Sequence, residues 1–338
     1  MPTTKPLLSA GARLALAFAA SVLSAAPVRA GDWVYRPFDQ QAPTYTADFG
    51  LRFWYGRGTT AKNLYDASGT QLISRLTYRD LSIFAAEAYT RFDLDRRWFL
   101  KGYAGGGALR KGNLRDEDFG LPPPLQPYSA TLSVQENGSP IYASVDAGFN
   151  VLWGPDFRIG LFGGFHYMNE TVSAFGCTQI SFNPFICGAF PIPNQVKVIT
   201  QDNNWYSVRL GVDAAVEFDR FRLSLDAAWL PYVWLNGSDA HWLRISDQPG
   251  DFSGPVPEDG KGWGYQVEGF LSYRVTDGLS LGIGGRYWYM QTRGLSHFEN
   301  HINGFVASPQ PVEWKTQNFG VFVQASLKLG PYFVIDVH

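Results

Sequence analysis

The stretch LSLGIGGRYWYM, residues Leu279–Met290, alternates between two kinds of side chain. Its odd-numbered positions are mostly apolar and end in two tyrosines, whereas its even-numbered positions carry serine, glycine, arginine and tryptophan. Successive side chains of a β-strand point to opposite faces of the sheet. The stretch therefore predicts a strand with one apolar face and one mixed, polar face.

The same alternation recurs in FRIGLFGGFHY (157–167), FRLSLDAAW (221–229) and YQVEGFLSYRV (265–275). A soluble β-sandwich also alternates, so the pattern alone does not choose between a soluble and a membrane protein. Aromatic residues gather near the ends of the apolar faces, which is typical of the interfacial girdle of a membrane barrel with a polar lumen. The alternation therefore favours a membrane barrel.

Ten such strands can be read along the chain, and their connections alternate between short and long. This layout predicts an all-β fold, a ten-stranded antiparallel transmembrane β-barrel with long extracellular loops and short periplasmic turns. The expected strands are 45–57, 72–93, 97–113, 140–153, 157–173, 203–218, 220–236, 262–275, 279–293 and 313–329.

The first 30 residues have the pattern of a secretory signal: Lys5 and Arg13, a short apolar run, and a small-residue end at Ala30. We expect residues 1–30 to be cleaved and 31–338 to form a single barrel domain in the bacterial outer membrane. Removing Lys5, Arg13 and Arg29 changes the formal net charge from −2 to −5. That mild acidity argues against nucleic acid as a partner.

The chain has two cysteines, Cys177 and Cys187. An exported chain meets an oxidising compartment, so a disulfide across this short loop is expected, the alternative being two free thiols. Two cysteines without nearby histidines do not form a zinc site. His297 and His301 are four residues apart but lie in a loop, whereas a zinc protease needs a helical H-E-x-x-H and a third ligand, so no metal is expected.

Two charged pairs lie at the ends of strands. Asp116 and Asp118 follow the third expected strand, and Asp239 and His241 follow the seventh. Strands three and seven are four places apart in a ring of ten, so both pairs should face one another across the extracellular mouth. Each short pattern could also be a solvated turn or a loose cation site.

The numbering of these pairs conflicts with the alternation of their strands. Lumenal positions of the third strand are odd and those of the seventh are even, but the acidic pair is even-numbered and the Asp–His pair is odd-numbered. Both pairs reach the lumen only if a β-bulge shifts the register first. We expect these bulges at Gly105–Gly107 and at Pro231.

With such bulges the four side chains can perform chemistry together. A carboxylate fixes the tautomer of a histidine and raises its basicity. An acid pair across the gap can hold a water against the imidazole, and that water can attack a peptide carbonyl. No metal or serine nucleophile is then needed.

The chain resembles the omptin family of outer-membrane proteases. The resemblance rests on SRLTY (74–78), KGYAGGG (101–107), the D-x-D, YSVRLGV (206–212), the D-x-H and ASLKL (325–329). It implies an outer-membrane endopeptidase with its active site facing outward. His241 would be the general base, Asp239 its orienting partner, Asp116 the residue that shares the water, and Asp118 its support.

The chain also departs from the family pattern. Acidic residues that select basic substrates are replaced by Gly237 and, on the first long loop, by Lys62, so a preference for Arg or Lys is not expected. The stretch for lipopolysaccharide contacts reads Phe165, Tyr167 and Asn169, which puts dependence on that lipid in doubt. No other cofactor is expected. The expected partners are peptide or protein substrates at the cell surface and outer-membrane lipid, with a monomer favoured.

The rival interpretation is a non-catalytic barrel, either a narrow pore, an adhesin or a structural protein. Bulky side chains on the lumenal face argue against a wide channel. They are Phe99, Tyr103, Phe162, Phe270 and Trp288. A surface lipid hydrolase would need a Ser–His–Asp set, which the sequence does not offer.

Overall fold

The computed structural model describes residues 45–120, 126–246, 248, 251–300, 304–306 and 309–330. They belong to one unit, Thr44–His338. The expected signal peptide 1–30 and the tail 331–338 lie outside the described residues. In the described part, no helix has both the length and the apolar character needed to cross a membrane.

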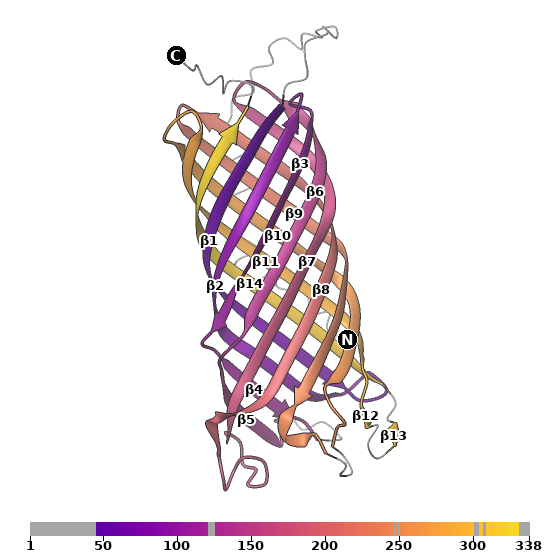
Figure 1. Ribbon diagram of the computed structural model, residues 1–338. Coiled ribbons are helices and arrows are strands. Elements are labelled where there is room, and N and C mark those ends of the chain that lie inside the picture. Colours follow the sequence, from indigo (N-terminus) through magenta and orange to yellow (C-terminus); the bar gives the residue numbers. More distant parts are fainter. Residues whose placement is uncertain are drawn as a thin grey trace. The chain divides into compact units, whose positions relative to one another are not determined.

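Ten antiparallel strands form a closed ring, because β1 pairs with both β14 and β2 (Figure 1). The ring strands are β1 (Tyr45–Tyr65), β2 (Leu72–Leu94), β3 (Trp98–Arg110), β6 (Ser139–Trp153), β7 (Phe157–Gln179), β8 (Ile192–Phe218), β9 (Phe221–His241), β10 (Val256–Arg274), β11 (Leu279–Ser296) and β14 (Gln310–Leu329). Shorter elements are β4 (Asn113–Asp118), β5 (Ser129–Gln135), η1 (Trp242–Arg244), β12 (Glu299–Asn300) and β13 (Phe305–Val306).

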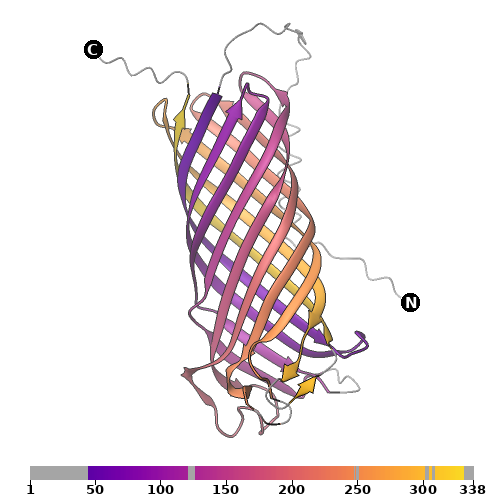
Figure 2. The same ribbon diagram turned by 45° about the vertical axis from the view of Figure 1, so that its right-hand side comes forward.

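The expected all-β barrel is confirmed, and each of the ten expected strands corresponds to one strand of the ring. The tight turns 95–97, 154–156, 219–220 and 275–278 lie together at one end, drawn at the top of Figure 2. The longer connections lie at the other end. This arrangement gives the barrel a short-turn end and a long-loop end.

The long connection after β3 was expected to be a loop, and this was wrong. Its residues form the hairpin β4–β5, in which β4 continues the edge of β3 along β2, and β5 continues β6 along β7. Other strands are also longer than expected at this end: β1 reaches Tyr65 and β8 begins at Ile192. The barrel wall therefore rises well beyond the apolar part of the strands.

The outer face of the barrel changes character along the strands. Exposed apolar side chains such as Phe53 and Ile283 are followed along the strands by aromatic residues such as the partly exposed Trp234. Beyond these, the outward positions carry polar residues such as Asn236 and Arg293. A band of this kind is the lipid-facing region with its aromatic girdle. On β9, Asp239 lies about 17 Å beyond Trp234 at the rise of an extended strand, so it lies outside the membrane-spanning region.

Side chains fill the lumen at membrane depth. The Trp54 ring lies 5.4 Å from that of Trp288 and 6.0 Å from that of Tyr142. Next to them, buried Arg286 bonds Glu87 at 2.8 Å and Glu268 at 2.9 Å. The bulky side chains expected in the lumen are there: Phe99, Phe162, Phe270 and Trp288 are buried, and Tyr103 packs against the core.

Candidate active site

A bulge at Pro231 turns Asp239 and His241 into the lumen, as expected. Strand β9 has one residue more than β8 and β10 over this stretch, so both neighbouring registers shift there. The buried positions change from even, such as Leu230, to odd, such as Val233 and Asp239. The proline removes a backbone donor, which suits a position where ladder pairing is interrupted.

The bulge expected at Gly105–Gly107 is wrong, because these glycines stay in register with β2. Instead, the absence of a side chain lets neighbouring groups pack closely against these glycines: a Cβ at Gly105 would lie 2.8 Å from the Tyr142 ring. The inward face changes further along, at Lys111 and Gly112, which have φ values of 61° and 149°. On β2, Asp80 has a φ of 55° at the same level, so both strands change face together and their register is kept.

Asp239 and His241 form a pair in which the carboxylate is buried and the imidazole is partly exposed. The His241 Nε2 lies 3.1 Å from the Asp239 Oδ2, and Asp239 is 2% exposed. Burial alone would raise the pKa of Asp239, but His241 and Lys62 outweigh it and hold that pKa well below its usual range. Burial would lower the pKa of His241, and the charge of Asp239 outweighs this and raises it. The ionised Asp239 accepts a hydrogen bond from Nε2–H, which leaves Nδ1 as the basic nitrogen.

Asp116 and Asp118 share one face of β4, two residues apart. Burial and then the charge of Asp118 raise the pKa of Asp116 to about 7, while His241 acts in the opposite direction. Burial also raises the pKa of Asp118, and it outweighs the hydrogen bond from Ser74 and the charge of His241, which both lower that pKa. The two carboxyls therefore titrate as an interacting pair, in which Asp116 keeps a proton up to about neutral pH. Both feel the charge of His241, so the structure brings the four predicted residues into one electrostatic cluster.

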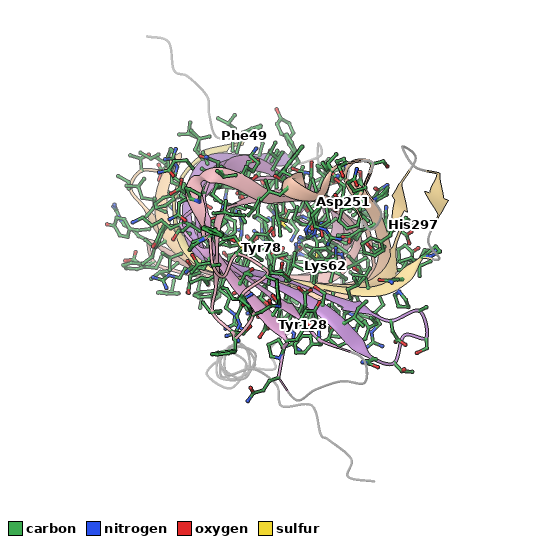
Figure 3. The ribbon with its side chains drawn as sticks, turned by 90° about the horizontal axis from the view of Figure 1, so that it is seen from below. Phe49, Lys62, Tyr78, Tyr128, Asp251 and His297 are labelled. Atoms are coloured by element: carbon green, nitrogen blue, oxygen red, sulfur yellow. A yellow bond between two sulfur atoms is a disulfide. The ribbon has the colours of Figure 1, made fainter. Side chains whose placement is uncertain are left out.

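The sequence prediction missed Lys62 and Glu258 as parts of this cluster. Lys62 was expected on a loop, but it belongs to β1, and its Nζ bonds the Asp239 Oδ2 at 2.7 Å and also Glu258. Figure 3, seen from the long-loop end, shows Lys62 inside the ring of strands and Phe49 on its outer side. The sequence did contain a signal for both residues. Lumenal positions of β1 and β10 are even-numbered, and the same alternation includes Lys62 and Glu258 if the strands are extended to them.

Gly237 faces the lumen beside Asn203, and a Cβ there would meet the Asn203 Oδ1 at 2.4 Å. On the outer face of β7, the Tyr167 hydroxyl donates to the Asn204 Oδ1 at 2.8 Å, and the Asn169 amide donates to the Asp202 Oδ1 at 2.6 Å. Phe165 lies exposed on the same face.

The remaining candidates lie apart from this cluster. Cys177 and Cys187 are joined by a disulfide at the base of the loop between β7 and β8. His297 bonds the Asp259 Oδ2 at 3.0 Å, and His301 lies outside the described residues. Within the described ranges there is no cluster of three or more His, Cys, Asp or Glu that could hold a metal ion.

The family model for the autotransporter beta-domain matches residues 65–286, more than half of the 338-residue chain. The chain belongs to the autotransporter beta-domain family. As a member of that family with a closed barrel, it is a β-barrel of the Gram-negative outer membrane, as expected. No curated protein matches the sequence.

Two outer-membrane proteins of known structure match the chain. The outer membrane protease OmpT from Escherichia coli is 17% identical, covers 85% of this chain and 97% of its own, and has a TM-score of 0.71. The translocator domain of the autotransporter NalP from Neisseria meningitidis is 9% identical, covers 94% of both chains and has a TM-score of 0.36. At these identities the similarity to OmpT shows the fold of this autotransporter beta-domain family member and nothing finer.

Proposed function

We propose that the protein is an omptin-like outer-membrane endopeptidase whose active site faces the cell exterior. One observation carries the proposal: β4 and β9 bring an acid pair and an Asp–His pair to the same mouth, one pair keeping a proton and the other containing an ionised carboxylate. The imidazole is held by an ionised partner, whereas Asp116 on the opposite wall keeps a proton up to about neutral pH. Pairs of titratable groups whose environments shift their pKa values in opposite directions are typical of acid–base catalysis.

In this proposal a water lies between Asp116 and the Nδ1 of His241. Nδ1 takes a proton from the water as its oxygen bonds to the carbonyl carbon of the scissile peptide. The protonated acid pair donates a hydrogen bond to the substrate. The C–N bond then breaks, and the imidazolium returns the proton to the leaving amine. Asp239 orients the ring and stabilises the imidazolium, as the buried carboxylate does in other histidine-based hydrolases.

Substrate preference follows from the same residues. Gly237 supplies no acid, and the charge of Lys62 is taken up by Asp239 and Glu258, so the proposal includes no selection for Arg or Lys. It includes no lipopolysaccharide requirement either, since the relevant β7 positions carry Phe165, Tyr167 and Asn169. The proposed substrates are peptides or proteins at the cell surface.

The test is a peptide-library digest by the refolded protein and its variants. Asp239→Asn and His241→Ala should each reduce cleavage by about 10³-fold or more, because both remove the oriented base. The matched control is His297→Ala, which breaks a similar His–Asp pair away from the cluster and should cleave normally. Undiminished cleavage by both site variants would refute the proposal.

A non-catalytic barrel is the second candidate, and membership of the autotransporter beta-domain family favours it. In that case the polar mouth would serve an adhesive or structural role. A folded wild-type protein that binds polypeptides but cleaves no member of the library would decide for this candidate.

A further inference from the structure

Lys62, the cation of this cluster, is buried in the lumen between two acidic residues. Lys62, Asp239 and Glu258 are each 2% exposed, although they come from three different strands. We propose that Lys62 is a positioning residue, which Glu258 holds in place and which in turn fixes Asp239 and, through it, His241. This inference rests on the proposed endopeptidase function.

Glu258 is anchored independently of Asp239. Three neutral donors from three other strands bond it: Ser296 Oγ at 2.9 Å, Trp314 Nε1 at 3.1 Å and Gln201 Nε2 at 3.3 Å. With its position set in this way, Glu258 fixes the Nζ of Lys62 by an ion pair. The Lys62 ammonium is therefore held in place by the anchored Glu258 carboxylate and not by solvent.

Lys62 and His241 contact the same oxygen of Asp239. The Oδ2 lies 2.7 Å from the Lys62 Nζ and 3.1 Å from the His241 Nε2. A charged donor on that oxygen prevents the carboxylate from rotating and draws charge away from the imidazole. Lys62 thus fixes the direction of the Asp–His bond and limits the basicity of His241.

Other roles for Lys62 fit the contacts less well. Burial would lower the pKa of Lys62, but Asp239 and Glu258 outweigh it and raise that pKa, so the amine stays protonated and cannot act as nucleophile or base. A substrate carboxylate would have to displace two buried partners to reach it. The remaining role is positioning.

The loss of Lys62 has to be judged against every charge that acts on His241. These charges belong to Asp239 on β9, Asp116 and Asp118 on β4, and Lys62 on β1. Further titratable groups act on these four: Glu258 on β10, Tyr78 on β2 and Arg244 in η1. The anions favour the imidazolium and Lys62 opposes it. Without Lys62, the apparent pKa of His241 should rise by about one unit.

The experiment compares Lys62→Met with the double variant Lys62→Met/Glu258→Gln, which removes one charge of each sign and so spares the fold an unpaired buried acid. The control is Lys261→Met, an exposed lysine on the outer face of β10. For each protein kcat and kcat/KM are measured against pH with a library substrate, and the His241 imidazole is titrated by NMR without substrate.

Both Lys62 variants should lose roughly 10- to 100-fold in kcat at pH 7, and both should move the acidic limb and the His241 titration upward, while Lys261→Met matches wild type. A double variant with the wild-type rate and pH profile would show that Lys62 only balances Glu258, which overturns the inference. If wild type cleaves nothing, the proposed function fails separately. The NMR titration still decides: an upward shift supports the link from Lys62 to His241, and an unchanged pKa overturns it.

Discussion

Asp116 couples the proposed chemistry to the stability of the fold. Burial and Asp118 raise its pKa from 3.8 to about 7. Between these two values the folded state holds a proton that the unfolded chain has released. Stability therefore falls as pH rises through this window, and the full penalty is present above pH 7. Above pH 7 the barrel would therefore be more stable if position 116 did not carry an acid.

We therefore predict that Asp116→Asn stabilises the barrel at pH 8 while it reduces cleavage. The gain should be on the order of 2 kcal/mol at pH 8 and much smaller at pH 4, because the amide cannot ionise. Thermal unfolding followed by circular dichroism at both pH values measures it. Asp259→Asn, at an exposed carboxyl, is the control, and equal stabilisation at both pH values would contradict the argument.

At the scale of single elements, the irregularities at Asp80 in β2 and at Lys111–Gly112 between β3 and β4 decide which way the acid pair points. Every residue after Lys111 would face the opposite way if the chain passed Gly112 as regular strand. Asp116 and Asp118 would then lie on the outer surface. The φ of 149° at Gly112 is a conformation that side-chain-bearing residues rarely adopt.

Gly112→Ala should therefore disturb the acid pair more than the barrel. A Cβ at this position would lie 2.9 Å from the Arg79 carbonyl oxygen in addition to the φ strain. We expect kcat/KM to fall at least roughly tenfold while the ten-stranded ring still refolds. Gly269→Ala is the matched control, since nothing lies within 4 Å of a Cβ there. Equal kcat/KM in the two variants would remove the role of Gly112.

At the scale of the whole molecule, aromatic and charged side chains fill the lumen at membrane depth. Trp54, Tyr142 and Trp288 pack edge to face across the lumen, and Arg286 is locked between Glu87 and Glu268. A ring of ten strands leaves little room beyond such side chains. The four residues of the mouth thus lie beyond a stretch of lumen that side chains fill.

Accordingly, the refolded protein should show no steady conductance in planar lipid bilayers. Replacing Trp54, Tyr142 and Trp288 together by Ala should open a measurable, small conductance, because their rings occupy the lumen. A lumen that conducts ions in the wild-type protein would contradict this packing and would favour the pore among the non-catalytic alternatives.

The sequence by itself determined the ring of strands, its alternating faces and the four residues of the mouth. In the membrane, one face of each strand contacts lipid and the other faces a polar lumen. Apolar and polar residues therefore alternate along LSLGIGGRYWYM. The D-x-D and D-x-H patterns are local as well, and so is the proline that marks the bulge in β9.

Only the tertiary structure decided how far the wall extends and which charges join the site. Beyond the girdle both faces of a strand are polar, so alternation disappears and β4, β5 and the end of β1 look like loops. The break at Lys111–Gly112 depends on Asp80 of a neighbouring strand. Lys62 and Glu258 meet Asp239 only because ring closure brings β1, β9 and β10 around one lumen, a proximity that no local pattern encodes.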